Sequence, residues 1–446
     1  MFLPEYVLRC LTALENRGFA SYAVGGCIRD AVLGRTPQDY DLCTAAEPAQ
    51  IKAAFPENRL ILAGEKHGTV GVITDGGVVE ITTFRTEGTY QDNRHPDWVA
   101  FVADVKEDLA RRDFTVKAMA YSPIRGFVDP FGGREDLQKG ILRAVGDPDA
   151  RFREDSLRIL RGVRFAVRYS LTPDAETEKS MVSLAPLMEN LARERVFDEL
   201  CKLLPLVSAE DILRFAPVLA QVIPELAPMV GFDQRSPHHA YDIYTHTAHV
   251  VGNTTPELTL RWAALLHDTG KVATFSTDET GRGHFYGHAQ ESATLADSIL
   301  RRLKAPTALR ERVVFLIEKH MVLLQPQRNT LRRQLSRWGE EPLRQLLSLQ
   351  QADFCSKGVA EDGTDFAAIL AMLEEIVAEN ACLTVKDLAI NGHDLMALGC
   401  SGPEIGKTLE FLLSQVLDET LPNERQALLD ALSLRFTGRK GSNPLQ

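Results

Sequence analysis

The pattern of apolar and polar positions changes near residue 143 of this 446-residue chain. Before that point, short apolar runs typical of half-buried strands alternate with amphipathic helical stretches, which predicts a mixed α/β unit. The expected strands are 21–24, 70–73, 78–84 and 118–121. From residue 143 onward, helical periodicity takes over almost completely, and proline-containing joints interrupt it at Pro224, Pro228 and Pro237.

The length of the chain predicts several domains, because a single hydrophobic core rarely organises so many residues. The periodicity and the joints divide the chain into an α/β head, a helical neck, a helical middle domain and a helical tail. Their expected ranges are 1–142, 143–225, 226–360 and 361–446.

Two carboxylates, Asp39 and Asp41, stand two positions apart on an expected strand and should point to the same face. Two like charges so close together favour a hard divalent cation such as Mg²⁺. Upstream, Gly25 and Gly26 let backbone N–H groups approach an anion where a helix is expected to start, at 27–33. Each feature alone is common in turns and at solvated edges, but together they indicate phosphoryl or nucleotidyl transfer.

A run of arginines beyond residue 143 predicts a helix face that binds anions. Three- and four-residue steps separate Asp155, Arg158, Arg161, Arg164 and Arg168. A face made almost entirely of arginine repels itself unless phosphates or carboxylates compensate the charge. We therefore favour a triphosphate or an RNA backbone over a merely solvated surface.

The net charge of −11 would by itself argue against an RNA partner. The acidity, however, lies mostly beyond residue 170, where 37 acidic residues face 27 basic ones. Residues 143–168 instead carry seven arginines against four acidic residues. This local basic stripe is typical of phosphate binding, so the global charge does not exclude RNA.

Four motifs, in order along the chain, resemble those of one enzyme family. The segments 24–30 and 39–42 resemble the signature of the nucleotidyltransferase superfamily that includes DNA polymerase beta. The segments 109–118, 129–133 and 151–161 resemble the later motifs of the bacterial-type (class II) CCA-adding enzymes and poly(A) polymerases. One departure is visible, since Lys117 stands where that family usually has asparagine.

The resemblance implies a polymerase beta-like α/β head, followed by mostly α-helical neck, HD and tail domains. It also implies an enzyme that adds CCA to tRNA 3′ ends from CTP and ATP without a nucleic-acid template. The implied catalytic carboxylates are Asp39 and Asp41, which would hold Mg²⁺, and Glu80 on the neighbouring strand. A surface glutamate at a strand end explains Glu80 equally well.

Eight residues of this chain match positions that bind the nucleotide in this family. Four of them would bind the triphosphate, and these are Gly25, Gly26, Arg29 and Arg112. The other four would hold the base and sugar, and these are Asp155, Arg158, Arg161 and Arg164. Asp155 and Arg158 would imitate a template base, because a carboxylate accepts and a guanidinium donates hydrogen bonds to Watson–Crick edges.

Members of the family that add only A, or that make poly(A), share these motifs, so those activities stay open alternatives. The polar, turn-rich segment 86–97 resembles a loop that CC-only members shorten or lack. It therefore argues only against a CC-only enzyme.

A second set of residues in the middle domain resembles the metal site of the HD phosphohydrolase superfamily. The matching residues are His246, His267, Asp268 and Asp353, with His288 and His320 as further candidate ligands. Mixed imidazole and carboxylate ligands suit transition metals with open positions for water and phosphate. Packed core histidines are the alternative, and the domain could equally serve as scaffold. The chain could also be an HD phosphohydrolase whose head only recognises RNA.

The seven cysteines are scattered and form no Cys-x-x-Cys pair, which favours a reducing compartment over a disulfide framework. No apolar run approaches the length that crosses a membrane, and the N-terminus lacks a signal pattern. We therefore expect a cytoplasmic protein without a membrane partner. No pattern in the sequence indicates an oligomeric state.

Overall fold

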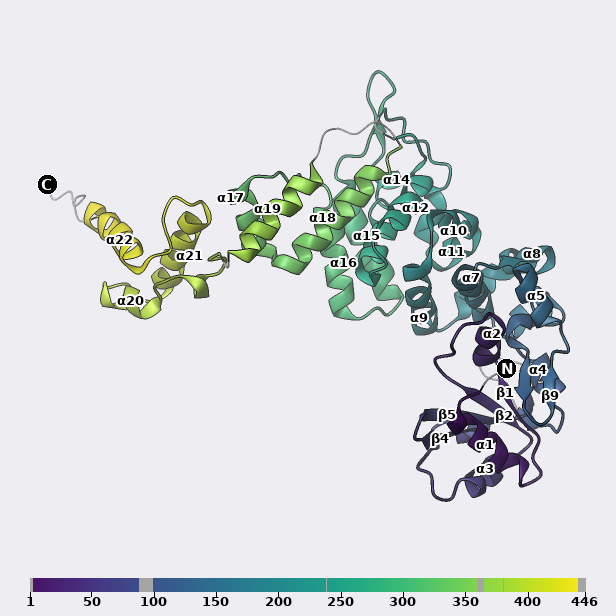
Figure 1. Cartoon of the computed structure of the whole chain (residues 1–446). Helices are drawn as coiled ribbons and strands as arrows, with labels where there is room; N and C mark the ends of the chain where they lie inside the picture. Colours follow the sequence, from purple (N-terminus) through teal and green to yellow (C-terminus); the bar gives the residue numbers. More distant parts are fainter. Residues whose placement is uncertain (1–2, 88–98, 238, 359–364, 380, 440–446) are drawn as a thin grey trace. The chain divides into compact units, whose positions relative to one another are not determined.

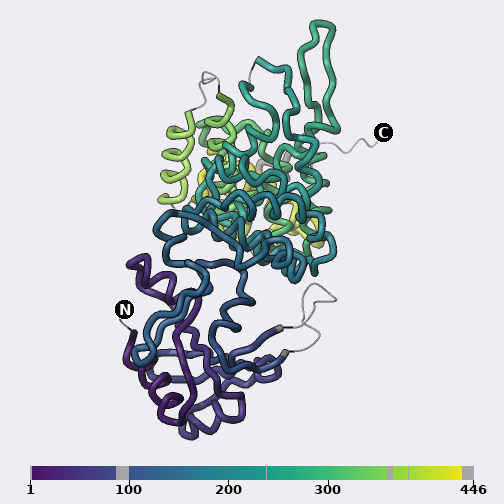
Figure 2. Tube along the Cα trace, turned by 90° about the vertical axis from the view of Figure 1, so that its right-hand side faces the viewer, coloured from purple at the N-terminus to yellow at the C-terminus, as the bar shows by residue number. Residues whose placement is uncertain are grey.

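The structure is a computed structural model that describes residues 3–87, 99–237, 239–358, 365–379 and 381–439. The chain forms two compact units. Unit 1 comprises Met1–Pro228 and Ile299–Ala305, and unit 2 comprises Met229–Ser298 and Pro306–Gln446. In Figure 2 the trace beyond the first third of the chain is mostly coiled into helices.

The head of unit 1 is built on a seven-stranded sheet with the order β3-β4-β5-β2-β1-β8-β9 (Figure 1). The strands are β1 Ser21–Val24, β2 Asp41–Thr44, β3 Leu60–Ile61, β4 Thr69–Thr74, β5 Gly77–Thr83, β8 Ala120–Ser122 and β9 Gly126–Val128. Strands β2 and β5 are parallel, and the other neighbours are antiparallel. The four strands expected from the sequence are confirmed as β1, β4, β5 and β8, with ends shifted by one or two residues.

Five short helices accompany this sheet, namely α1 Glu5–Glu15, α2 Gly26–Val32, α3 Pro48–Ala54, α4 Val105–Ala110 and α5 Gly133–Lys139. The expected helix at 27–33 is thus confirmed as α2. A core cluster packs Leu109 of α4 against Val24 of β1 and Phe84 at the end of β5. This packing fixes the segment after α4 next to the strands that carry the expected site. A small ribbon, β6 Arg85–Glu87 with β7 Val99–Phe101, flanks the segment 86–97, most of which lies outside the described residues.

The rest of unit 1 is mostly helical, as expected for the neck. It contains α6 Pro148–Glu154, α7 Leu157–Tyr169, α8 Ala175–Leu184, α9 Arg193–Leu203, α10 Ala209–Arg214 and α11 Ala216–Val222, with β10 Ile141–Leu142 paired to β11 Thr172–Pro173. α7 buries an apolar face at the helical positions between its arginines, with Ile159, Leu160 and Val163 at most 1% exposed.

The arginine helix is not continuous, which corrects the expectation that Asp155 shares a helical face with the arginines. Asp155 has extended backbone angles (φ −144°, ψ 101°) at the end of α6, and α7 begins two residues later at Leu157. Its carboxylate accepts a hydrogen bond from the backbone N–H of Leu157 at 3.1 Å. Aspartate competes with helical hydrogen bonds in this way, and it breaks the helix here.

Unit 2 is helical apart from a short hairpin of β12 Ser276–Thr277 and β13 Gly283–His284. Its helices are α12 Ile243–Asn253, α13 Leu258–Leu266, α14 Lys271–Thr274, α15 His288–Arg302, α16 Thr307–Lys319, α17 Arg328–Trp338, α18 Glu340–Cys355, α19 Phe366–Ala378, α20 Gly392–Ala397, α21 Pro403–Leu417 and α22 Arg425–Arg439. The last three helices share a core of their own, which includes Leu395, Leu412 and Leu428. A search of the described residues found no helix with both the length and the apolar character that a membrane crossing requires.

Candidate functional site

The carboxylates expected to bind metal lie at the end of the parallel strand pair of the head. Asp41 is the first residue of β2, and its register partner on β5 is Glu80. Side chains at paired positions of neighbouring strands project to the same face, so the structure brings Asp41 and Glu80 together. Asp39 lies two residues before β2 rather than on it, which corrects the expectation that both aspartates belong to the strand.

The electrostatics of Asp41 match those of a cation site. The pKa of Asp41 is raised above its ordinary value, first because surrounding protein desolvates the carboxylate and then because Asp39 and Glu80 lie nearby. Arg112 and Lys117 act in the opposite direction. Asp41 still remains exposed to solvent. A divalent cation would relieve this repulsion, so the donor set fits a hard metal such as Mg²⁺.

The glycine pair and two arginines form the expected phosphate side of this site. Gly25 has a φ of +76°, and a Cβ there would lie 3.1 Å from Nη1 of Arg112. A Cβ on Gly26 would lie 3.7 Å from Nη2 of Arg29. Nη2 of Arg112 donates to Asp108 at 3.2 Å, whereas its buried Nε has no hydrogen-bond partner among the described residues. The absence of side chains at both glycines therefore leaves room for an anion beside two guanidinium groups.

Arg29 ties this corner of the head to α7. Its guanidinium donates to Asp30 at 2.7 Å and lies 3.9 Å from the ring centroid of Tyr169. Arg29 is only 5% exposed. A cation held over an aromatic face and beside one carboxylate keeps a fixed position.

Three of the four arginines of α7 are compensated by protein carboxylates. Arg158 pairs with Glu154 at 2.5 Å, Arg161 with Asp113 at 2.5 Å, and Arg164 with Glu199 at 2.7 Å. The self-repulsion inferred from the sequence is thus already relieved inside unit 1. The charge of this face alone therefore gives no reason to expect a phosphate on it.

Asp155 and Arg158, the expected template pair, do not bond to each other. Asp155 accepts from Arg195 at 2.8 Å, while Arg158 also donates to the backbone carbonyl of Arg111 at 3.1 Å. Asp155 is thus held against α9, and Arg158 is held against the segment that contains Arg111. They are preorganised, and an incoming base would compete for the same donors and acceptors.

A second cluster lies in unit 2, where five helices deliver six side chains. His246 comes from α12, His267 and Asp268 follow α13, His288 begins α15, His320 follows α16 and Asp353 lies in α18. Each of the four imidazoles places Nδ1 against a backbone carbonyl, at distances of 2.6–3.2 Å. This arrangement makes Nδ1 the donor and leaves every Nε2 as a lone pair that can bind a metal.

The Nε2 atoms and the two carboxylates converge. His246 lies 2.9 Å from Asp353, and His267 lies 3.2 Å from Asp268. On the other side of Asp268, the Nε2 atoms of His288 and His320 lie 3.3 Å apart. Within the described residues, the ligand atoms form two overlapping groups of three that share Asp268. The four imidazoles and two carboxylates thus fit one or two transition-metal ions, with Asp268 able to bridge them.

Unpaired atoms and protonation states agree with this assignment. In the described part of the chain, Nε2 of His246 and Nε2 of His267 are buried without a hydrogen-bond partner, while Oδ2 of Asp268 lies 2.8 Å from the ammonium of Lys271. Burial lowers the pKa of His320 to about 4, and it also lowers that of His288, so both are neutral at pH 7. Burial alone would raise the pKa of Asp268, but the neighbouring His267 and Lys271 hold it well below the usual range. These three groups are in the protonation states that metal ligands require. Burial would lower the pKa of His267, but the charge of Asp268 raises it above its ordinary value, so a metal would have to displace a proton there.

Comparisons with known proteins decide the family. The model of the poly A polymerase head domain matches residues 21–143, and that of tRNA nucleotidyltransferase domain 2 matches residues 275–432. A third, described as the probable RNA and SrmB-binding site of polymerase A, matches residues 170–229. The CCA-adding enzymes of Lactiplantibacillus plantarum and Levilactobacillus brevis are 32% and 34% identical, over 94% and 95% of this chain and 93% and 96% of theirs. The chain belongs to the CCA-adding enzyme family.

A solved CCA-adding enzyme supports the same assignment. The Bacillus stearothermophilus enzyme in complex with CTP matches with a TM-score of 0.74 at 27% identity, over 99% of this chain and 100% of that one. The Geobacillus thermodenitrificans enzyme is 41% identical over 226 residues, which is 49% of this chain and about half (55%) of that relative. The expected family is confirmed, and so is the expected fold class of a polymerase beta-like head followed by a mostly helical region.

Two residues that the sequence patterns did not assign to the site, Asp113 and Lys117, are coupled electrostatically to its charged groups. Burial would raise the pKa of Asp113, but Arg161 and Lys117 hold it far below its usual range. Burial lowers the pKa of Lys117 to about 8, an effect that Asp113 opposes and that Arg161, Arg112 and Arg29 reinforce. The sequence contained a signal for Asp113, because this residue directly follows two arginines inside the family motif 109–118.

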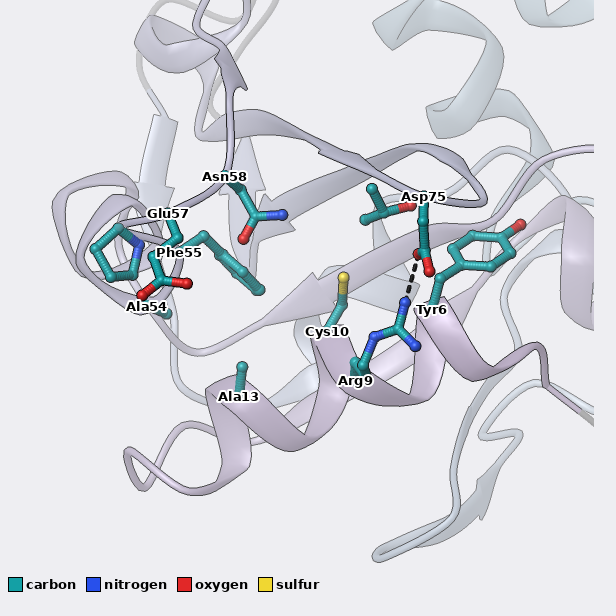
Figure 3. Close-up of a pocket in the computed structure, with 11 residues that line it drawn as sticks. Tyr6, Arg9, Cys10, Ala13, Ala54, Phe55, Glu57, Asn58 and Asp75 are labelled. Carbon is teal, nitrogen blue, oxygen red and sulfur yellow. Dashed lines mark hydrogen bonds and ion pairs between the residues drawn. The ribbon is translucent and has the colours of Figure 1, made fainter.

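A separate pocket of about 450 Å³ lies elsewhere in the head and contains none of the expected site residues (Figure 3). Tyr6, Arg9, Cys10 and Ala13 of α1 line it on one side, and Arg9 pairs with Asp75 in the turn between β4 and β5. This pocket therefore contributes none of the residues expected to bind the metal or the nucleotide.

Proposed function

We propose that this chain adds C, C and A to the 3′ ends of tRNA, with CTP and ATP as substrates. The observation that carries the proposal is the carboxylate pair Asp41 and Glu80 beside Gly25 and Arg112, in a chain similar over its whole length to CCA-adding enzymes. The 3′-terminal hydroxyl oxygen of the RNA attacks the α-phosphorus in line. One P–O bond forms, and the bond to pyrophosphate breaks.

The expected site residues of the head would each have a role in this reaction. Asp39, Asp41 and Glu80 would hold Mg²⁺, which supplies charge neutralisation at the phosphates and lowers the pKa of the RNA hydroxyl. Arg112 and Arg29 would bind the triphosphate, with Gly25 and Gly26 giving it close access to the backbone. These groups position the hydroxyl and the α-phosphate, and positioning supplies most of the rate in phosphoryl transfer.

The test is extension of a tRNA that lacks its terminal CCA, with labelled CTP and ATP in the presence of Mg²⁺. We expect both labels to be incorporated, CTP first. No extension under these conditions would refute the proposal. Extension by the wild type alone, and not by an Asp39→Ala/Asp41→Ala variant, would assign the chemistry to the head rather than to unit 2.

Arg158→Ala should damage nucleotide selection more than turnover. The carboxylate site would stay intact, but the variant would lose one charge-assisted, bidentate hydrogen-bonding contact. Such a contact contributes about 1–3 kcal/mol, so the preference for CTP and ATP should fall roughly 5- to 150-fold. Competition of CTP and ATP against UTP and GTP measures this directly. Because Arg158 also holds Glu154, a thermal melt should accompany the assay. Wild-type discrimination in a folded variant would place the template role elsewhere.

Lys117 should make nucleotide binding depend on pH above neutrality. Its pKa of about 8 means that the ammonium loses its charge as pH rises through 8, which removes a cation beside Arg29 and Arg112. We expect the KM for CTP to rise between pH 7 and 9 in the wild type. In Lys117→Asn, which restores the amide usual in the family, the KM should be higher at pH 7 and flatter with pH. Parallel profiles for the two proteins would contradict this role.

We infer a second activity for unit 2, the hydrolysis of 2′,3′-cyclic or terminal phosphates on RNA ends. The observation that favours it is the convergence of four Nε2 lone pairs and two carboxylates. The unit boundary after residue 228 supports a separate middle domain that starts near 226.

Bound transition metal would supply a hydroxide-like water and a Lewis acid. The water oxygen would bond to phosphorus, and the P–O ester bond would break. A 3′-phosphate blocks nucleotide addition, so its removal would restore a substrate for the head.

A further inference from the structure

A pocket of about 260 Å³ opens directly above the histidine cluster of unit 2. Asp268, His288, His320 and Asp353 belong to its lining, so any occupant contacts the candidate metal ligands. The β12–β13 hairpin and the residues just after it supply another part of the wall, including Arg282, His284 and Tyr286. The floor of the pocket is therefore formed by candidate metal ligands, whereas this wall carries an arginine, a histidine and a tyrosine.

That wall carries an exposed aromatic platform. Tyr286 is 77% exposed, and its ring stacks on the imidazole of His284 with centroids 5.3 Å apart and planes 7° from parallel. Nε2 of His284 in turn contacts Asp278 at 2.9 Å, which fixes the orientation of the imidazole. An exposed tyrosine ring whose orientation is fixed by a neighbouring ring offers a π-face on which a nucleobase can stack.

The hairpin beneath the platform is firmly anchored. Phe285 packs on Phe275, whose ring also meets Phe232 edge to face at 5.1 Å. The backbone of Gly283 lies so close to Gln234 that a Cβ would come within 2.2 Å of its carbonyl oxygen. Tyr286 thus projects from a rigid support, and its exposure does not reflect a loose loop.

Two cations line the same pocket without a carboxylate partner among the described residues. These are Arg282, an exposed residue, and Lys357, whose ammonium lies 5.2 Å from the ring of Phe354. Lys271, by contrast, is already paired with Asp268 at 2.8 Å. Arg282 and Lys357 are therefore available to phosphates that extend beyond the floor of the pocket.

We propose that this pocket is a binding site for the terminal nucleotide of an RNA 3′ end, whose base stacks on Tyr286 while its phosphate reaches the histidine cluster. Arg282 and Lys357 bind the preceding phosphates of the strand. The proposal rests on the hydrolase function inferred above, for which it names the group that recognises the substrate. Stacking accepts any base, which suits an activity on RNA ends of varied sequence.

Binding tests the site independently of turnover. The full-length protein, with the head saturated by CTP, is titrated with a 3′-phosphonate analogue of adenosine, whose carbon–phosphorus bond resists hydrolysis. Tyr286→Ala and Tyr286→Leu should weaken binding about fivefold or more, the lower end of the range for loss of one base–aromatic stack. Tyr286→Phe keeps the ring and should bind as the wild type does. Inorganic phosphate should bind all four proteins equally.

An oligonucleotide with the same phosphonate end separates RNA from free nucleotide as the occupant. Arg282→Ala/Lys357→Ala should weaken binding of the oligonucleotide but not of the mononucleoside analogue. Equal binding by wild type and Tyr286→Ala, or no binding by the wild type, overturns the site. Equal loss for both ligands in the double variant overturns the assignment to an RNA strand. If the wild type hydrolyses no phosphate ester yet binds through Tyr286, the hydrolase proposal fails while the nucleotide site stands.

Discussion

Replacement of Asp41 by alanine is expected to lower the rate of nucleotide addition by about 1,000-fold or more. Asp41 begins β2 beside Glu80, and the negative charges of Asp39 and Glu80 raise its pKa. Its loss would remove a ligand of the divalent cation, whose charge stabilisation at a phosphoryl group is worth several kcal/mol. About 4 kcal/mol corresponds to three orders of magnitude in rate. Single-turnover extension of tRNA lacking CCA measures the effect.

Asp75→Ala provides a matched control in the same domain. Asp75 is an exposed aspartate in the turn between β4 and β5, and it pairs with Arg9 at the surface. Its replacement should leave the rate of addition unchanged, because an exposed pair contributes little to stability and lies outside the site. A loss of less than tenfold in Asp41→Ala would contradict the role given to the carboxylate.

The double variant His267→Ala/Asp268→Ala should abolish both metal binding and phosphate-ester hydrolysis by unit 2. Asp268 belongs to both overlapping ligand groups, so its removal opens each of them. Elemental analysis should fall from at least one transition-metal ion per chain to none, and hydrolysis of 2′,3′-cyclic nucleotides should become undetectable. Nucleotide addition by the head should persist.

Replacement of Asp268 by alanine also leaves the buried ammonium of Lys271 without its carboxylate partner. A second variant therefore separates the loss of the metal site from misfolding. Asp353→Asn keeps the shape of the side chain and should still lower hydrolysis strongly. His249→Ala alters a histidine of α12 that lies outside the cluster, and it should change neither metal content nor hydrolysis. A wild type without metal, or undiminished hydrolysis in the double variant, would leave unit 2 as scaffold.

The strands and the apolar face of α7 could be predicted because short-range periodicity determines them. The break at Asp155 could not, because it depends on the aspartate side chain capping the N–H of Leu157 instead of extending the helix. The partners of the arginines were equally hidden, since Arg161 meets Asp113 across 48 residues and Arg164 meets Glu199 across 35. Long-range ion pairs leave no periodic trace in a sequence.

The histidine cluster shows the opposite case. Resemblance to a superfamily motif predicted its six residues, although five separate helices deliver them. The tautomers that leave every Nε2 unprotonated depend on backbone carbonyls that accept from Nδ1. Carbonyls such as those of Ala264 and Ile317 reach these positions only in the folded chain. The aromatic platform of Tyr286 was missed for the same reason, because a tyrosine two residues from a histidine carries no signal of stacking by itself.

The most direct test of the central claim is extension of three RNAs by the purified full-length protein with Mg²⁺, CTP and ATP. One is a tRNA that ends before CCA, one is the same tRNA ending after CC, and one is an unrelated RNA. The account predicts addition of three nucleotides to the first, one A to the second and no addition to the third. Extension of the second RNA alone would indicate an A-adding enzyme, a long A tract on the third would indicate a poly(A) polymerase, and either result would contradict the account.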